Sequence, residues 1–312
     1  MRKSDTTVHG VLLLDKPTGM SSNAALQRTR KLFNWAKAGH TGTLDPLATG
    51  LLPVCLGEAT KYSHALLDAD KTYEAVIRLG FTSSTGDAEG LIQPVSAPQF
   101  SEQRLAEVLL SFLGTSKQVP PMHSALKRDG RPLYEYARAG EEIAREARQI
   151  TIKTLILTGF APPGELSIRV ACSKGTYIRV LAEDIGKSLG CGGYLLGLRR
   201  TMIADLDISR ALNLETLENL APEGRIGCLL PVDRLLQGLP VVRLDAEGTR
   251  RVCTGLAASV AGADPGLSRL YDSSDRFLGT GEVGDDGTVS PKRMIANPQN
   301  TGIGLSAPRL SP

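Results

Sequence analysis

The chain has 312 residues, of which 41% are hydrophobic and 22% are charged, so it holds enough apolar side chains for one large or two smaller domains. No apolar run approaches the roughly 18 residues of a membrane span, and the first short one meets Asp15 and Lys16, so we expect neither a membrane segment nor a signal peptide. The net charge of +3 permits a nucleic-acid partner without requiring one. Five scattered cysteines, with no metal-ligand spacing, are expected to be reduced, buried thiols of a cytoplasmic protein.

The N-terminal part predicts a strand, an amphipathic helix and then a glycine-rich loop. Residues 11–19 read as a short apolar strand that ends in a Lys-Pro-Thr-Gly turn. A helix is expected over residues 21–34, with Ser21 or Ser22 as its N-cap and basic residues on its outer face. GHTGTLDPLATG follows at 39–50. Its three glycines and its proline are incompatible with a regular helix, and its centre is too polar for a buried strand.

The middle of the chain predicts an antiparallel sheet with helices. Residues 71–80 alternate between apolar and polar side chains and are expected to form a strand. Residues 118–140 predict an extended arm, with Asp129-Gly130 as the turn of a hairpin. The same patterns predict further strands at 150–160, 165–175 and 194–208 and helices at 100–114 and 176–190.

From about residue 239, short strands and glycine-rich turns predict a small β-barrel-like domain, and the last dozen residues are expected to be frayed. GTGEVG at 279–284 matches the dinucleotide fingerprint, but the DDGTVSP that follows cannot form the helix which that motif needs. The sequence also contains no P-loop, HExxH or GxSxG motif, which argues against nucleotide, zinc-protease and serine-hydrolase sites.

The loop at 39–50 carries one carboxylate, Asp45. The ordinary interpretation is a turn acid before a proline. However, Pro46 restricts Asp45 to extended backbone, and Gly39 and Gly42 allow close approach of another backbone or a nucleic acid. A carboxylate held rigidly among short side chains suits nucleophilic or general-base chemistry. The loop is therefore our candidate for the catalytic centre.

Several segments in this order resemble the bacterial tRNA pseudouridine synthases of the TruB type. The segments are VLLLDKPTGMSSN, GHTGTLDPLATG, GEATKYSHALLDADKTYEAVIRLG, SALKRDGRPLYEYAR and CSKGTYIRVLAEDIG. The resemblance runs from about residue 9 to 210 and continues more weakly into a segment that looks like a PUA domain. We expect an α+β fold with a mixed, mainly antiparallel central sheet flanked by helices. The catalytic domain would span 1–240, with an RNA-binding arm inserted at about 100–150, and a PUA-like barrel would span 241–312.

The resemblance implies an isomerase that converts uridine 55 in the T loop of tRNA to pseudouridine, with no metal and no cofactor. Asp45 would be the essential carboxylate, and Arg179 would orient it and hold its pKa down. The sequence leaves open whether Asp45 attacks C1′, attacks C6 or takes a proton from C2′. The substrate-binding positions implied by the same motifs are His40, Tyr73, Arg179, Tyr177, Leu198 and Lys16.

Without the resemblance, Tyr73, Arg179 and His40 would be interpreted as ordinary strand, helix and loop residues. With it, His40 helps to hold the flipped base and Tyr73 stacks on the uracil. Three basic residues of the arm are expected to contact RNA phosphates: Lys127, Arg128 and Arg131. His123 stands where relatives carry Tyr, so its contact with RNA stays open.

The expected partner is the T-arm stem-loop of tRNA, and we expect a monomer with no metal and no membrane contact. A tRNA-folding chaperone is the main alternative, acting beside or instead of the enzyme. A guided rRNA-modifying relative is disfavoured because the chain lacks long basic tails. A phosphate-binding metabolic enzyme that uses the loop at 39–50 is the alternative without RNA.

Overall fold

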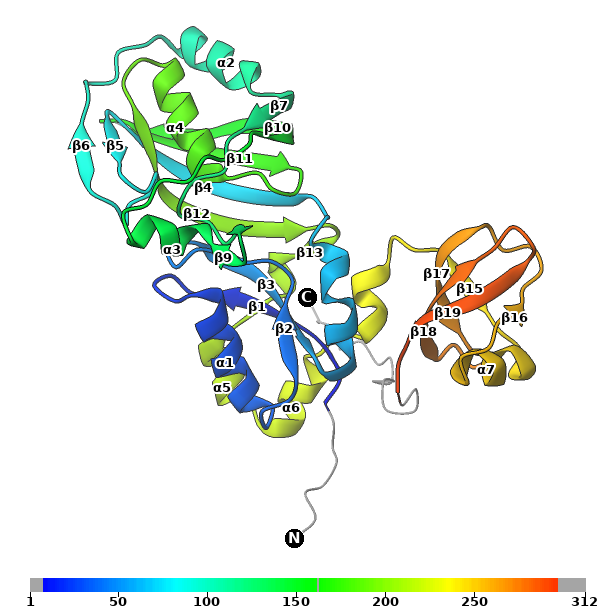
Figure 1. Ribbon diagram of the computed structural model, residues 1–312. Helices are drawn as coiled ribbons and strands as arrows, with labels where there is room; N and C mark the ends of the chain where they lie inside the picture. Colours follow the sequence, from blue (N-terminus) through cyan, green and yellow to red (C-terminus); the bar gives the residue numbers. More distant parts are fainter. Residues whose placement is uncertain (1–7, 162, 297–312) are drawn as a thin grey trace, which may run out of the picture.

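Two sheets organise the computed structural model, which describes residues 8–161 and 163–296 (Figure 1). The expected frayed end lies outside the described residues. The larger sheet has ten strands in the order β14-β1-β3-β12-β4-β11-β10-β7, with β2 added to β3 and β13 added to β12. Its strands are β1 (Gly10–Lys16), β2 (Ala38–His40), β3 (Thr49–Leu56), β4 (Lys71–Leu79), β7 (Gly114–Gln118), β10 (Arg148–Ala161), β11 (Glu165–Cys172), β12 (Gly193–Ile203), β13 (Leu206–Asp207) and β14 (Leu212–Asn213).

Helices and two small hairpins complete this part of the chain. The helices are α1 (Ser22–Leu32), α2 (Glu102–Ser111), α3 (Leu133–Arg138), α4 (Ile178–Ser188), α5 (Leu214–Asn219), α6 (Pro222–Gly227) and the 3₁₀ helices η1 (Gly57–Leu66), η2 (Ile208–Arg210) and η3 (Val232–Leu236). The hairpins pair β5 (Phe81–Ser83) with β6 (Ile92–Pro94) and β8 (Lys127–Arg128) with β9 (Arg131–Pro132). The expected hairpin turn is present, because Asp129 and Gly130 both have positive φ, at 51° and 80°.

The larger sheet is mixed and mainly antiparallel, as predicted. Only the pairs β1–β14 and β3–β12 run parallel. β4 pairs antiparallel with β11 on one side and with β12 on the other, and it is the strand whose alternation was read from the sequence. Its apolar side chains, from Tyr73 to Leu79, are buried on one face, whereas Glu74 on the other face is exposed.

Two groups of helices pack on one face of the larger sheet, and the other face is covered only in part. In Figure 1, α1 and α5 lie beside β1 and β2, while α2 and α4 lie over β4, β10 and β12. Side chains from both groups of helices join one continuous core. η1 and η3 cover the opposite face of β1 and β3 with a second core. The opposite face of β4, β11 and β12 stays open to solvent, which antiparallel sheets tolerate.

The C-terminal segment folds into a curled sheet of five strands in the order β15-β17-β18-β19-β16 (Figure 1). Its elements are β15 (Val241–Arg243), α7 (Ala246–Cys253), β16 (Ala258–Ser259), β17 (Gly266–Tyr271), β18 (Phe277–Val283) and β19 (Thr288–Met294). The rejected dinucleotide motif falls in β18 and in the turn after it. The sheet packs on η1, where the Tyr62 hydroxyl donates to the carbonyl of Arg293 at 2.5 Å and the Tyr62 ring meets Phe277 edge to face.

The sequence identified the cap of α1 correctly, as Ser21, but two details differ. The side chains of Ser21, Ser101 and Asn213 accept hydrogen bonds from backbone N–H groups in the first turns of α1, α2 and α5. The strand expected at 194–208 ends at Ile203, because the chain turns before it pairs back as β13. All five cysteines are free, but Cys228 is only half-buried and Cys253 is exposed, so the expectation that all are buried is wrong.

Candidate active site

The loop between β2 and β3 is held on both sides of Asp45. The buried Ser22 hydroxyl accepts a hydrogen bond from the N–H of Leu44 at 2.7 Å and lies 2.9 Å from its carbonyl. On the other side, the N–H of Gly19 donates to the carbonyl of Pro46 at 2.8 Å. The start of α1 and the turn after β1 therefore fix the backbone that carries the carboxylate, as the loop composition predicted.

Arg179 points at this carboxylate from the first turn of α4. Its side chain is only 5% exposed, and Nη2 lies 3.1 Å from Oδ2 of Asp45. The same guanidinium donates to the backbone carbonyls of Thr85, at 3.2 Å, and of His123, at 2.6 Å. His123 therefore contributes its backbone carbonyl to the site. These three partners around one planar group fix the direction from which Arg179 meets Asp45.

A second carboxylate, Asp87, shares Arg179, and the sequence analysis did not find it. Asp87 is buried, and its Oδ2 lies 3.5 Å from Nη1 of Arg179. Its other oxygen accepts hydrogen bonds from the Thr85 hydroxyl at 2.6 Å and from the N–H of Glu89 at 3.1 Å. In the sequence, Asp87 is an acid in a Gly-Asp turn, and no local signal shows that tertiary contacts bury it.

The electrostatic balance at Asp45 differs from our expectation. Burial raises the pKa of the Asp45 carboxyl, the neighbouring Asp87 raises it further, and Arg179 and Lys16 oppose this without reversing it. The net direction is upward: Arg179 holds the pKa of the Asp45 carboxyl down, as predicted, but burial outweighs it. Arg179 orients the carboxylate and limits the rise of its pKa.

Asp45 and Arg179 lie in the wall of a small inner cavity of about 170 Å³. Tyr73 from β4 and Leu198 from β12 contribute apolar surface, and Tyr177 lies beside Arg179. The remaining lining residues are Thr43, Leu44, Ser124, Ala125, Thr176 and Ile178. A carboxylate–guanidinium pair beside aromatic and aliphatic walls suits a planar ring with one reacting edge.

A wider outer cavity of about 420 Å³ adjoins this site and shares Asp45 and Arg179 with it. His40, at the end of β2, lines this outer cavity. Burial, followed by the charge of Arg200, lowers the pKa of the His40 imidazole, so the ring is neutral near pH 7. A neutral imidazole in the wall of a cavity can stack on a nucleic-acid base.

Hydrogen bonds of the Lys16 side chain and of the Tyr177 backbone fix the segments next to the site. Lys16 is fully buried, outside the walls of both cavities, and its ammonium donates to the carbonyls of Pro17 and Met20 at 2.7 and 2.6 Å. Burial lowers the Lys16 pKa to about 8. The backbone of Tyr177 is held from both sides by the Gln118 amide, at 2.8 and 3.1 Å, which joins the start of α4 to the end of β7.

The three basic residues of the arm lie at its exposed hairpin. Lys127 and Arg128 are exposed on β8, whereas Arg131 on β9 is half-buried. The Arg131 guanidinium stacks on the Tyr136 ring at 4.3 Å and pairs with Glu135 at 3.4 Å. Arg131 therefore also stabilises the arm itself, which the sequence did not indicate.

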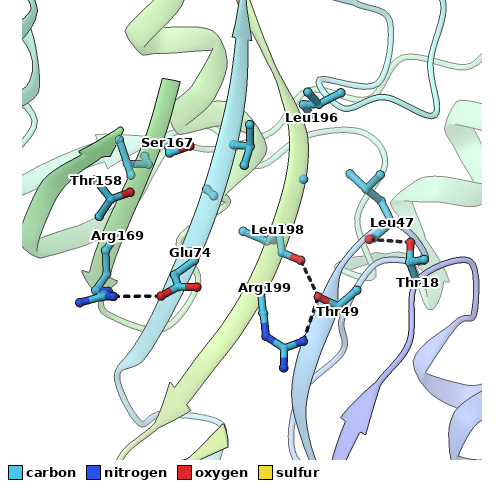
Figure 2. Close-up of a pocket in the computed structure, with 14 residues that line it drawn as sticks. Thr18, Leu47, Thr49, Glu74, Thr158, Ser167, Arg169, Leu196, Leu198 and Arg199 are labelled. Carbon is cyan, nitrogen blue, oxygen red and sulfur yellow. Dashed lines mark hydrogen bonds and ion pairs between the residues drawn. The ribbon is translucent and has the colours of Figure 1, made fainter. Parts of the chain in front are cut away.

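A larger hollow of about 660 Å³ lies on the open face of the sheet, and Asp45 is not among the residues that line it. Figure 2 shows the side chains that line it, among them Glu74, Arg169 and Arg199. Glu74 and Arg169 form an ion pair at 3.0 Å with both side chains about half exposed. Such pairs are typical of a solvated sheet face, so the smaller cavity around Asp45 is the better candidate for chemistry.

In the described residues, 8–161 and 163–296, no group of three or more His, Cys, Asp or Glu side chains is arranged to hold a metal ion. Within the same ranges, no helix is long and apolar enough to cross a membrane.

Solved structures share the fold of this chain. A chain from a structure titled "Crystal Structure of a Cbf5-Nop10-Gar1 Complex" matches 89% of this chain and 79% of its own length, with 26% identity and a TM-score of 0.68. A chain from "Structure of H/ACA RNP bound to a substrate RNA containing 2'-deoxyuridine" matches 96% of this chain and 90% of its own, with 23% identity and a TM-score of 0.71, which shows the fold.

The family follows from the sequence comparisons. Residues 30–178 match the model described as "TruB family pseudouridylate synthase (N terminal domain)", and 179–237 and 240–295 match two TruB C-terminal models. The chain is 53% identical to proteins named "tRNA pseudouridine synthase B" from Dechloromonas aromatica (92% of this chain, 96% of the relative) and Aromatoleum aromaticum (93% of each). The chain therefore belongs to the TruB family of pseudouridylate synthases, which are isomerases.

Proposed function

We propose that this enzyme converts uridine 55 in the T loop of tRNA to pseudouridine without a cofactor, with Asp45 as its essential carboxylate. The bond from N1 to C1′ breaks, the uracil turns, C5 bonds to C1′, and the proton lost from C5 is balanced by one gained at N1. The relatives' printed name supports tRNA as the substrate. The observation that carries the assignment of Asp45 is its ion pair with the buried Arg179 inside the inner cavity.

We infer the roles of the residues around Asp45 from their positions in the two cavities. The target base must leave the stack of the T loop to reach a carboxylate in a cavity. His40 lines the outer cavity, so its ring can enter the gap that the flipped base leaves in the RNA. Tyr73 and Leu198 contact the extruded ring in the inner cavity, Tyr177 adds to its wall, and Lys16 braces the loop from behind.

We also propose a catalytic domain at 1–240 with the RNA-binding arm at about 100–150, and a PUA-like domain at 241–312 that contacts the acceptor-stem side of tRNA. The enzyme would act as a cytoplasmic monomer. Arg243, Arg250 and Arg251 are exposed on the C-terminal domain and can contact phosphates, with Arg243 paired to Asp275 and Arg250 to Glu247 in the absence of RNA.

The raised pKa of Asp45 predicts where activity falls in acid. The carboxylate is the active form, so activity is present above its pKa and is lost as the pH falls through it. Because that pKa is raised, half of the activity should be lost at a pH above the ordinary value of 3.8. Single-turnover rates measured between about pH 4 and pH 8 would check this. An acid limb at or below the ordinary value, with the fold intact by circular dichroism, would contradict the proposed environment.

The exposed basic residues of the arm lead to a separate prediction about RNA binding. Replacing Lys127 and Arg128 together by Ala should weaken binding to every T-arm sequence similarly and should reduce the slope of log affinity against log salt by about 1 per lost phosphate contact. Lys153→Ala, on β10, is the matched control with an exposed lysine outside the arm. An unchanged salt slope in the double variant would remove these residues from the RNA interface.

Mapping pseudouridine on an unmodified tRNA transcript tests the proposed substrate. The expected product is one pseudouridine, at position 55, and none elsewhere in the transcript. Product at another position would show a synthase of different specificity. Tight binding and faster tRNA folding without any pseudouridine would favour the chaperone.

A further inference from the structure

Arg200 is a buried cation next to the active site, and so far only its effect on the His40 pKa has been described. It is 1% exposed and is among the largest fully buried side chains. Its neighbour Arg199 points to the opposite face of β12 (Figure 2), where it is 40% exposed and pairs with Asp15 at 2.7 Å. One strand therefore carries a solvent-facing arginine and a buried arginine side by side, because successive side chains alternate between faces.

Arg200 connects the loop at 39–50, which carries Asp45, to the sheet through hydrogen bonds. Its Nε donates to the carbonyl of Leu51 in β3 at 2.8 Å, and its Nη2 donates to the carbonyl of Gly42 at 3.2 Å. Gly42 precedes Asp45 by three residues in the loop. The planar guanidinium therefore sets the distance between that loop and the strand behind it.

Arg200 also reaches Tyr73. The two residues are direct partners across the antiparallel pair of β12 and β4, so their side chains leave the same face of the sheet. Burial raises the pKa of the Tyr73 phenol, and the nearby charge of Arg200 acts in the opposite direction. Burial lowers the pKa of the Arg200 guanidinium, and Tyr73 opposes this. The phenol and the guanidinium are thus electrostatically coupled.

A buried guanidinium is costly unless polar partners surround it. Within residues 8–161 and 163–296, Arg200 forms no ion pair with a carboxylate; it donates to two carbonyls and lies beside its cross-strand partner Tyr73. β12 can approach β3 this closely because Gly50 has no Cβ, which would collide with the backbone of Arg200. Gly42 lies in the loop at 39–50, Leu51 lies in β3 directly after it, and Tyr73 lies in the wall of the inner cavity.

We propose that Arg200 is a positioning residue for pseudouridine formation, which orients the Tyr73 phenol and fixes the Asp45 loop relative to it. This inference rests on the proposed roles of Asp45 and Tyr73. Arg200 does not touch the uracil but acts through these two residues. Because a misplacement of about 1 Å costs on the order of 10²-fold in rate, its loss should lower kcat and leave RNA affinity nearly unchanged.

The test compares Arg200→Lys and Arg200→Met with Arg199→Lys, the matched control one residue away. Each protein is assayed for the single-turnover rate on a T-arm stem-loop and for RNA affinity. Protein labelled with ¹³C at tyrosine Cζ reports the phenol, and the signal that disappears in Tyr73→Phe belongs to Tyr73. The Arg200 variants should react on the order of 10²-fold more slowly and shift the Tyr73 signal, whereas Arg199→Lys should do neither.

Three outcomes would overturn the proposal: normal rates in both Arg200 variants, a slower rate with an unmoved Tyr73 signal, or a moved signal with a normal rate. If neither variant folds, Tyr73→Phe provides the test, because the Arg200 side-chain N–H protons should exchange faster there than in the wild type, and equal exchange would refute the contact. An active Asp45→Asn enzyme would instead refute the proposed function. Inactive Asp45→Asn with normal Arg200 variants would refute this inference alone.

Discussion

Asp45→Asn is expected to lower the rate of pseudouridine formation on the order of 10⁴-fold or more while leaving RNA affinity almost unchanged. Asn has nearly the same shape as Asp and its Oδ1 can still accept from Arg179, so the loop and the RNA-binding surface should stay intact. What disappears is the negative charge, which any of the three candidate roles of Asp45 requires. Single-turnover assays and filter binding with the same T-arm stem-loop measure both quantities.

Asp68→Asn is the control for this change, because Asp68 is an exposed carboxylate that pairs with Lys174 at 2.8 Å on the surface. It should react at the wild-type rate. If Asp45→Asn reacts as fast as Asp68→Asn, Asp45 is not the essential carboxylate. If Asp45→Asn loses RNA affinity in proportion to rate, the residue contributes to binding and not to the chemical step.

Arg179→Lys is expected to lower kcat on the order of 10²- to 10³-fold, although it preserves the positive charge. The guanidinium meets Asp45, Asp87 and two backbone carbonyls at once. A lysine ammonium has three donors at a single point and cannot reproduce this planar arrangement. The Asp45 carboxylate would keep a nearby cation but lose its fixed orientation.

Arg169→Lys is the matched control, because Arg169 forms a simple surface ion pair with Glu74 on the open face of the sheet (Figure 2). Surface pairs of this kind contribute about 0–1 kcal/mol, so activity and stability should hardly change. Comparable rates in Arg179→Lys and Arg169→Lys would mean that any cation near Asp45 is sufficient. Thermal unfolding of both variants would separate a loss of fold from a loss of orientation.

The sequence predicted most of the fold because its local signals and its tertiary structure agree. The alternation in β4 is buried on one side only, the predicted Ser21 cap begins α1, and Asp129-Gly130 turns the hairpin of the arm. What local patterns cannot show is which strands become neighbours. The parallel contact of β3 with β12, which places Arg200 beside Gly50, joins residues far apart in the chain.

For the candidate site, the loop composition indicated a rigidly held Asp45. In the structure, hydrogen bonds of Ser22 and Gly19 fix the backbone on both sides of it. Asp87 and Arg200 could not be found in this way, because a turn acid and one of two adjacent arginines look like surface residues in a sequence. Their burial depends on contacts with α4 and β3 that no local period encodes. The net rise of the Asp45 pKa could not be predicted for the same reason, since desolvation is a property of the folded environment.

The most direct test of the account is pseudouridine formation by the purified wild-type protein on an unmodified T-arm stem-loop, in buffer treated with a chelator and free of any added cofactor. The account predicts stoichiometric conversion of the target uridine and no conversion when that uridine is moved by one position in the loop. Tight binding without any product, under conditions in which the fold is intact, would contradict the central claim that this chain isomerises the T-loop uridine by itself.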